Sequence, residues 1–395
     1  SSTPTIIENN THVCMMTVSK KNESDDDDRP LPLSELKKWM SDDVYLWINE
    51  GDEKQQLFEK ELEDNAAMNA SNLFRDAKSE SGDAGSSAEL TRLQHWSSSS
   101  TSPDGVGGFE RIKSKLYMAD EDPEQNSEDG KDSDDDAYGG VEVVFLLSDS
   151  YQGFGDVLWS SARHVANKIA DPTQCKELLS PLFSPDYIDK QSCHHPLCGI
   201  SFLEVGAGAG VPSWAAMKCG ANVVCTDLSD TNRIRCMAEC AERNFQQMIA
   251  DSDNDYDNRI VLLKNASKTR VCPHDWGSPV DRVVKALNND SSNETKDFRK
   301  RLFDVIIAAD CCYMPWWHSE LLDSIHRLLS DTGVAIIAFA LHGNTGDDDV
   351  WKIVDRAKSK GFLVDSLESQ QLTPPSGDME SKQGLVHTIR LTKPM

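Results

Sequence analysis

The sequence predicts an α/β fold in which several parallel strands alternate with helices and the chain ends in an antiparallel pair of strands. One observation is the stretch from Ser201 to Asp227, which reads as strand, glycine-rich loop, helix and strand. A second is the alternation of apolar runs with amphipathic stretches that continues to the C-terminus. A third is the segment 371–384, which is too short for a crossover helix, so that the flanking strands 362–367 and 385–391 must be antiparallel.

A glycine-rich loop stands at the centre of the stretch 201–227. Gly206, Gly208 and Gly210 follow the first apolar run. Glycines let the backbone turn sharply and approach a ligand closely, and the helix that follows points its N–H groups at the same place. Asp227 ends the second strand, where its carboxylate can accept hydrogen bonds from two ribose hydroxyls. The stretch indicates a nucleoside-binding half-site, although similar loops also occur in purely structural strand–helix turns.

The glycine spacing narrows the class of nucleoside. A dinucleotide-binding GxGxxG fingerprint requires glycine or alanine at position 211, where Val211 stands, and the chain contains no GxxxxGK[ST] phosphate loop. The spacing is GxGxG, with an acidic residue just before it, and it resembles the first motif of class I S-adenosylmethionine-dependent methyltransferases. The resemblance implies S-adenosyl-L-methionine as cofactor, with Asp227 on its ribose. It also assigns to the cofactor these residues of the loop: Glu204, Gly206, Ala207, Gly208 and Gly210.

Composition and charge limit the partners. The chain has 395 residues, a formal charge of −26 and 11 cysteines without regular spacing. Such a negative charge opposes binding to nucleic acids and anionic membranes and favours basic partners. No apolar run approaches the ~18 residues of a membrane-spanning helix, and the N-terminus lacks a signal-peptide pattern. We therefore expect a soluble, cytoplasmic, monomeric protein with reduced thiols.

The acidic charge is concentrated in residues 1–140, which carry a net charge of −18, against −8 for residues 141–395. Acidic and serine runs in this first region cannot bury enough apolar surface to offset chain entropy, so most of it is predicted to be disordered. The exception is the segment 31–78, whose apolar residues recur at helical spacing and predict two short helices. This segment is expected either to pack on the second domain, 141–395, or to dock a substrate.

Ordered sequence returns with a predicted strand at 141–149 and a helix over 153–172, ended by Pro172. Trp159 near the start of this helix resembles a tryptophan that lies beside the cofactor in the lysine-methyltransferase-like group; a helix that merely covers the sheet explains it equally. The run from Cys193 to Cys198, CHHPLC, contains zinc-type ligands, but no second pair of ligands lies nearby in the sequence. It is predicted to be a solvated loop, and we assign no metal.

After Asp227 the sequence predicts a helix to Asn244, a polar insert over 246–258, a third strand at 259–263 and a polar insertion over 278–301. Between the last two lies the sequence HDWG. A D-W pair at this place resembles the adenine pocket of the same methyltransferases. The resemblance puts the Asp275 carboxylate on the exocyclic amine and the Trp276 indole against the ring. A generic loop is the alternative.

The second informative constellation is FDVIIAADCCY, over 303–313. Its continuous apolar run predicts a parallel strand buried on both faces, ending at Asp310. Because ligands bind at the carboxyl ends of such strands, Asp310 should face the same crevice as the glycine loop. The D-x-x-Y sequence to Tyr313 resembles the motif of methyltransferases that modify lysines and protein N-termini, and this resemblance assigns Ala309 to the cofactor. Helix N-capping by Asp310 is the structural alternative.

The resemblance covers residues 141–395 and implies a Rossmann-like, seven-stranded sheet. Within the group, the chain is most similar to nicotinamide-N-methyltransferase-like enzymes that methylate the N-terminus and adjacent lysine of translation elongation factor 1-alpha. This similarity implies methyl transfer to an amine of a basic protein, in which Asp310 orients the amine and Tyr313 walls the transfer channel. A small-molecule amine methyltransferase and a non-catalytic scaffold with the same fold remain alternatives.

Overall fold

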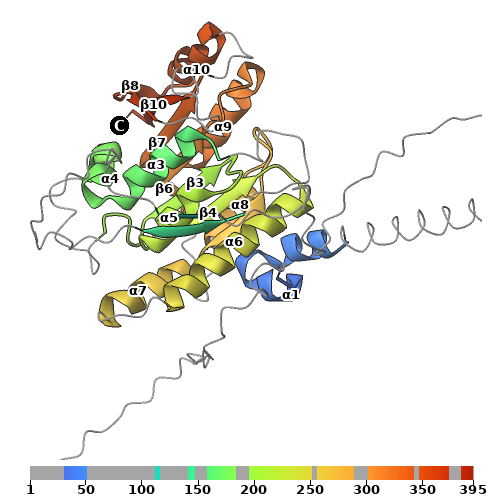
Figure 1. Ribbon diagram of the computed structural model, residues 1–395. Coiled ribbons are helices and arrows are strands. Elements are labelled where there is room, and N and C mark those ends of the chain that lie inside the picture. The colour runs from blue at the N-terminus through green and yellow to red at the C-terminus, as the bar shows by residue number, and fades with distance from the viewer. Residues whose placement is uncertain are drawn as a thin grey trace, which may run out of the picture.

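The structure is a computed structural model (Figure 1). It describes residues 31–50, 112–115, 141–146, 158–183, 195–250, 256–288, 301–341, 347–372 and 384–394. The predicted disorder of the acidic region and the helical segment beyond residue 50 lie outside these residues. None of the described helices is both long and apolar enough to span a bilayer.

A central sheet organises the described residues, with strand order β5-β4-β3-β6-β7-β10-β8 and the short β9 paired to β10. Strands β5, β4, β3, β6 and β7 pair in parallel, while β10 runs antiparallel to both β7 and β8. The predicted fold class, a mostly parallel sheet with an antiparallel C-terminal pair, is confirmed. The strands are β3 Ser201–Val205, β4 Asn222–Asp227, β5 Arg270–Pro273, β6 Phe303–Ala309, β7 Leu329–Ala340, β8 Leu363–Ser366, β9 Gln370–Gln371 and β10 Leu385–Thr392.

Helices connect and cover these strands. Helices α3, α5 and α6 pack against one another along the sheet, α8 packs on β4 and β5, and α9 and α10 pack together beside β7 and β8 (Figure 1). Their bounds are α3 Ser160–Ala170, α4 Pro172–Leu178, η4 Ser180–Leu182, α5 Val211–Lys218, α6 Thr231–Ala250, α7 Tyr256–Ala266, α8 Asp281–Asn288, η6 Pro315–Trp317, α9 His318–Leu328 and α10 Asp347–Ser359.

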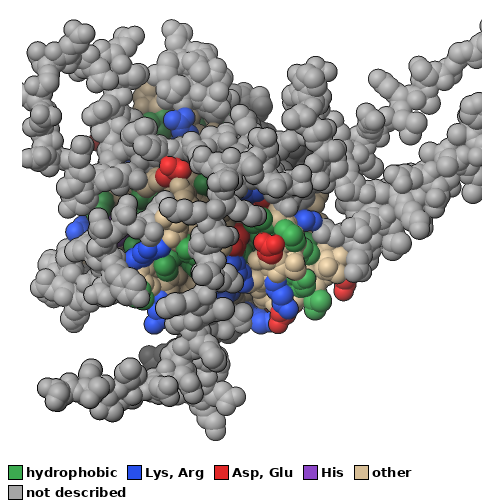
Figure 2. All heavy atoms as spheres, turned by 60° about the horizontal axis from the view of Figure 1, so that its bottom comes forward, with side chains coloured by type: hydrophobic (Ala, Val, Ile, Leu, Met, Phe, Trp, Pro, Cys, Tyr) green, Lys and Arg blue, Asp and Glu red, His purple; other side chains and the backbone are tan. Residues whose placement is uncertain are grey.

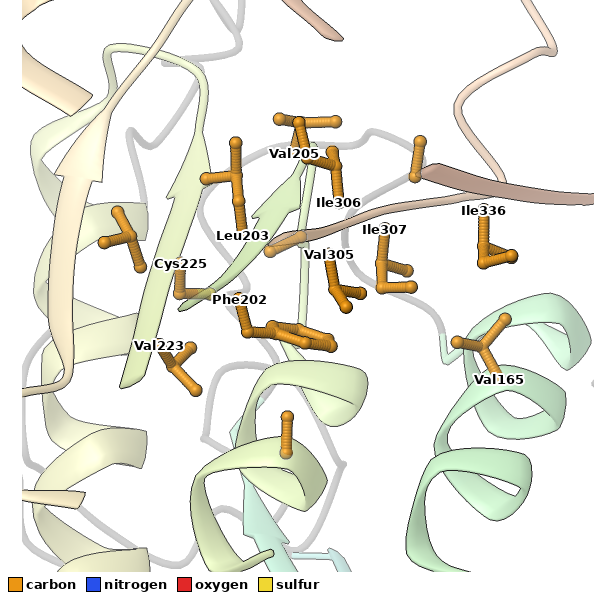
Figure 3. Close-up of a cluster of buried hydrophobic side chains, with 14 of the residues drawn as sticks. Val165, Phe202, Leu203, Val205, Val223, Cys225, Val305, Ile306, Ile307 and Ile336 are labelled. Carbon is orange, nitrogen blue, oxygen red and sulfur yellow. The ribbon is translucent and has the colours of Figure 1, made fainter. Parts of the chain in front are cut away.

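The core follows from strands that are apolar on both faces. In β3 and β6 successive side chains point to opposite sides of the sheet. Figure 3 shows Phe202 and Val305 directed toward the helices that include Val165 of α3, with Leu203 and Ile306 on the other side. All five side chains have no exposed surface. Burial on both faces explains why the strands read as continuous apolar runs.

The predicted third strand at 259–263 is wrong. These residues lie in α7, and the strand that pairs with β4 is β5, ten residues further on. A short apolar run does not by itself distinguish a strand from a helix. Ile260 is 47% exposed, as on a helix that covers α5 and α6, and not buried as in a central strand.

Two other boundaries differ from the predictions. The helix predicted over 153–172 is α3, which starts later, at Ser160, and ends at Ala170 just before Pro172 as predicted. Pro172 also begins α4, where its missing N–H costs nothing, and the Asp171 carboxylate caps α4 by accepting from the N–H groups of Thr173 and Gln174. The predicted polar insertion 278–301 contains α8, whose Val283 is fully buried. This helix makes the crossover between β5 and β6.

The predicted strand at 141–149 exists but does not join the central sheet. It is β2, Glu142–Phe145, and it pairs antiparallel with β1, Ile112–Lys115. The Asn244 side chain of α6 bonds both the N–H and the carbonyl of Val144, at 3.0 and 2.6 Å. These bonds fasten β2 along α6.

Free thiols predominate among the described cysteines. Eight of them are free and buried, and burial raises the pKa of thiols such as Cys219 to about 12. Cys198, by contrast, is disulfide-bonded, so the expectation of reduced thiols is wrong for that residue. The loop 195–198 is also not simply solvated, because Leu197 has no exposed surface.

The segment 31–50 packs on the body of the protein. It contains α1 Leu33–Leu36, η2 Lys37–Trp39 and a helical stretch over 42–50. The indole of Trp39 is 1% exposed, and its Nε1 donates to the Glu242 carboxylate of α6 at 2.6 Å, where Lys38 also pairs at 2.6 Å. Basic and acidic side chains lie close together on the described part of the face in Figure 2, and Asp43 pairs with Arg282 of α8 at 3.2 Å.

We expect Trp39→Ala to lower the free energy of unfolding by about 3–5 kcal/mol. The substitution removes a buried aromatic ring from the hydrophobic core and the hydrogen bond that the indole donates to Glu242. Leu46→Ala, on the same segment but 57% exposed, is the matched control and should change the free energy of unfolding by less than about 0.5 kcal/mol. Urea unfolding of the native protein and of both variants measures these changes in the free energy of unfolding. Equal, small effects would show that the segment does not contribute to the folded core.

Candidate active site

A cavity of about 410 Å³ lies where the parallel strands end. Gly206 follows β3, Asp227 ends β4, His274 follows β5 and Ala309 ends β6, and all four line it. This is the edge at which open α/β sheets bind ligands, and the volume is that of a small-molecule pocket. The lining consists of Leu158, Trp159, Ala162, Gly206, Ala207, Gly208, Ala209, Asp227, Leu228, Arg233, His274, Asp275, Trp276, Ala309, Asp310, Cys311, Tyr313, Met314 and Trp317.

The structure brings together nearly all the residues that the sequence singled out. Only Glu204 and Gly210 lie outside the lining. The predicted residues that do line the cavity are Trp159, Gly206, Ala207, Gly208, Asp227, Asp275, Trp276, Ala309, Asp310 and Tyr313.

Gly206 is fixed by close packing between three strand ends. Its φ is +64°, and a Cβ here would lie 2.8 Å from the Cys311 Sγ and 2.9 Å from Cζ2 of Trp276. The position therefore requires glycine for both conformation and space. Position 210 requires glycine for a different reason. With φ +68° it caps α5, and a Cβ would meet the indole of Trp214 at 2.9 Å, so it shapes the helix start and not the cavity wall.

Glu204 lies behind the loop, 1% exposed. Its Oε2 accepts from the backbone N–H of Ser213 at 2.9 Å and from the Ser213 hydroxyl at 2.5 Å, which ties β3 to α5. Burial raises its pKa to about 8, so the side chain is mostly a neutral acid at pH 7. The contacts give Glu204 a structural role, and its contact with the cofactor stays a prediction.

Asp227 is held at the cavity by three donors. One carboxylate oxygen accepts from Gly208 N–H at 2.6 Å, and the other from Leu228 N–H at 2.7 Å and from the Arg233 guanidinium at 3.0 Å. A carboxylate has about four acceptor positions, so any ligand hydroxyl bound to Asp227 would share this group with Arg233. Arg233 stands in the first turn of α6, and its side chain is 14% exposed.

The loop after β5 supplies one wall and is braced by α9. The hydroxyl of Ser324 accepts from the N–H of Gly277 at 2.9 Å and lies 3.1 Å from Nε2 of His274. Burial lowers the pKa of His274 to about 4, so its ring is neutral near pH 7. The Asp275 carboxylate accepts from the N–H and the hydroxyl of Ser229, at 3.0 and 2.7 Å. Both sides of the Trp276 loop are thus fixed.

Asp310 occupies a strained turn at the end of β6. Its φ of +57° is the only positive value among the described non-glycine residues, a conformation that costs about 1–3 kcal/mol. Two hydrogen bonds to the backbone of β7 hold Asp310 there. Its N–H donates to Ala338 O at 2.7 Å, and its side-chain Oδ1 accepts from Ala340 N–H at 3.3 Å. It caps no helix, because the residue before η6 is Met314. The helix-capping alternative is therefore wrong, and Asp310 is one of the residues that line the cavity.

Tyr313 stands three residues further along the same wall. Burial raises the pKa of its phenol to about 12, with nearby acidic groups acting in the same direction. The phenol is therefore neutral at physiological pH. It offers a flat surface and a hydroxyl, and it is too weakly acidic to act as a phenolate base.

Sequence reasoning missed several lining residues. Arg233 lies in the helix predicted to run to Asn244, and Trp317 lies in η6, to which the motifs assigned no role. Cys311 lies inside the D-x-x-Y motif, and a Cβ at Gly206 would come within 2.8 Å of its Sγ. The adjacent tryptophans Trp316 and Trp317, directly after D-x-x-Y, are the sequence signal that could have indicated Trp317.

Comparison with known proteins agrees with the motifs. No family model matches the chain. It is 27% identical over 203 residues to "Protein N-terminal and lysine N-methyltransferase efm7" of Aspergillus fumigatus, covering 51% of this chain and 61% of the relative. The protein of the same name in Schizosaccharomyces pombe is 25% identical over 239 residues, covering 60% and 75%. The match thus spans about three fifths of the length of the Aspergillus relative. These matches confirm the predicted resemblance to protein N-terminal and lysine methyltransferases, at 25–27% identity.

Two solved structures with partial similarity to this chain are named as methyltransferases. One is a putative SAM-dependent methyltransferase from Streptococcus mutans, with a TM-score of 0.36, 16% identity and coverage of 64% of this chain and 54% of that one. Another is the magnesium protoporphyrin IX methyltransferase of Synechocystis with bound SAM, with a TM-score of 0.33, 14% identity and coverage of 62% and 87%.

The raised pKa of Glu204 predicts a pH dependence of stability. The Glu204 side chain has a pKa of 4.5 in the unfolded chain and of about 8 in the folded protein. Its contribution to the unfolding free energy is therefore fully present below about pH 4.5 and is lost as the pH rises through 8. Glu204→Gln mimics the neutral acid and removes this loss. The difference in unfolding free energy between variant and native protein should shift in favour of the variant by on the order of 4 kcal/mol from pH 5 to 9.

Urea unfolding at several pH values measures this difference. Since all other titrating groups are common to both proteins, they cancel in the comparison. A difference that does not change with pH would show that Glu204 is ionised in the folded state.

Proposed function

We propose that this chain is an S-adenosylmethionine-dependent N-methyltransferase that methylates a protein amine, either a lysine side chain or an N-terminal amine. The observation that supports this proposal most is that Asp227, at the end of β4, and Asp310, directly after β6, line the same cavity. Both residues belong to motifs that resemble those of methyltransferases. The names of the matched relatives support a protein acceptor.

The residues present fit the cofactor. The lining combines an acidic residue for ribose hydroxyls, Asp227, with an aromatic wall, Trp276, and a loop without side chains at Gly206 and Gly208. The Asp227 carboxylate also suits a ligand that carries positive charge on its sulfonium and ammonium groups. When bound, S-adenosylmethionine supplies a methyl group that is already activated on sulfur.

The chain's own contribution is then to position the amine and exclude water. Asp310, fixed by its bonds to β7, accepts an N–H of the incoming amine and so directs the nitrogen lone pair into the cavity. The neutral phenol of Tyr313 forms part of the cavity wall along which the amine would enter. An α-amino group, with a pKa of about 7.7–8.0, loses its proton easily, whereas a lysine near 10.4 depends on desolvation at the cavity mouth to do so.

The finer features of the substrate are part of the same proposal. The net charge of −26 favours a basic acceptor segment, and translation elongation factor 1-alpha is the first acceptor to test, given the sequence resemblance. We further propose that the protein acts as a monomer in the cytoplasm.

Two isosteric substitutions separate binding from transfer. Asp227→Asn should weaken cofactor binding by about 10- to 100-fold, because it removes a charged acceptor. Asp310→Asn should lower the methyl-transfer rate by about 100-fold or more while the cofactor Kd changes by less than about threefold. Asparagine tolerates a positive φ, so it tests the charge of Asp310 and not the turn. Calorimetry and single-turnover transfer measure the two effects; full transfer by Asp310→Asn would remove Asp310 from the mechanism.

The proposed function itself is tested by incubating the protein with methyl-tritiated S-adenosylmethionine and a cell extract. We expect cofactor binding by calorimetry and label in a protein band, with label on a lysine or N-terminus by mass spectrometry. Label in small molecules alone would favour a small-amine methyltransferase. Failure to bind the cofactor would favour a scaffold.

A further inference from the structure

Exposed apolar side chains lie on the wall of the cavity and next to it along the chain. The described residues include six large exposed hydrophobic side chains, and three of these are Leu228, Trp316 and Trp317, exposed by 58, 66 and 44%. Leu228 and Trp317 line the cavity, and Trp316 is the neighbour of Trp317 in η6. We call these three residues the apolar rim. Single exposed hydrophobic residues are ordinary, but a group of them beside a pocket marks a binding surface.

The tryptophans of the apolar rim stand on a rigid base. Pro315 between Met314 and Trp316 is buried, and the Trp317 N–H donates to Met314 O at 3.0 Å. The Arg356 guanidinium of α10 bonds the carbonyl of Pro315. Nε2 of His318, at the start of α9, lies 2.8 Å from the carbonyl of Cys312. Two helices thus clamp this segment, so the indoles are exposed by the fold and not by a loose loop.

Charge at the cavity indicates which partner fits. Three carboxylates, those of Asp227, Asp275 and Asp310, line it against one guanidinium, that of Arg233, and His274 is neutral because burial lowers its pKa to about 4. An acidic cavity beside an apolar rim suits a cationic chain that also carries an apolar side chain. Tryptophan is the residue most enriched among binding hot spots.

We propose that the apolar rim docks a bulky apolar side chain located within a few residues of the acceptor amine, in an extended basic segment of a protein. The inference rests on the proposed function for the identity of the amine and adds a recognition element outside the cavity. Because an extended chain advances about 3.3 Å per residue, an amine in the cavity leaves residues 2–6 of the segment free to reach the rim. A small-molecule amine held in the cavity would not reach Trp316, which does not line it.

The test uses the full chain and synthetic peptides with a free N-terminal amine, one lysine, a serine background and a C-terminal fluorophore. A single phenylalanine is moved through positions 2–6, and an all-serine peptide serves as reference. Binding is followed by fluorescence anisotropy in the presence of S-adenosylhomocysteine. Trp316→Ala is compared with Leu363→Ala, a matched control because Leu363 is 57% exposed on β8, away from the cavity lining.

We expect at least one phenylalanine position to tighten binding to the native protein by about tenfold. Trp316→Ala should lose this gain with an unchanged melting temperature, and Leu363→Ala should keep it. No gain at any position, or a gain that survives Trp316→Ala, would overturn the proposal. It would also be overturned if Trp316→Ala abolished self-association in sedimentation experiments without affecting the peptides, since the rim would then bind a second copy.

Methyl transfer to the same peptides separates this inference from the proposed function. Peptides that bind through Trp316 but accept no label support the docking surface and contradict the proposed function. Peptides that accept label equally, with or without phenylalanine, support the function and contradict the docking surface.

Discussion

The close approach of Gly206 to Trp276 and Cys311 is the constraint on which the site depends. These three residues follow β3, β5 and β6, and a Cβ at Gly206 would overlap both neighbours. Glycine therefore lets three strand ends converge over one cavity. The same convergence places Asp227 and Asp310 at that cavity, although they are far apart in the sequence. One packing arrangement thus positions both residues to which binding and transfer are proposed.

Around that contact, polar bonds hold the site in shape from outside the cavity. Glu204 fixes α5 behind the glycine loop, Ser324 of α9 holds the loop of Trp276, and β7 holds Asp310 in its strained turn. Helix α9 also begins at His318, which contacts the carbonyl of Cys312 on the acceptor side. One helix thus braces both the proposed adenine wall and the proposed amine entry.

Prediction from sequence succeeded where local chemistry specified the structure. The glycine loop, the strand ending at Asp310 and the antiparallel C-terminal pair required only spacing, turn residues and apolar runs. It failed at 259–263 and 278–301, because an apolar run of four residues and a polar stretch with few apolar positions each fit more than one element. The helix end before Pro172 was predicted, but the start of α4 at Pro172 was not, since proline is compatible with both the end and the first turn of a helix.

By itself the sequence determined the order of the strands and helices around the motifs and the residue types at the strand ends, because these depend on neighbours along the chain. Only the tertiary structure decided that Glu204 and Gly210 lie behind the loop, that Arg233 shares the carboxylate of Asp227, and that Trp39 belongs to the common core. It also decided that Trp316 and Trp317 stay exposed at the cavity mouth. The reason is that burial and ion pairing depend on which elements pack together, and that packing joins residues far apart in the chain.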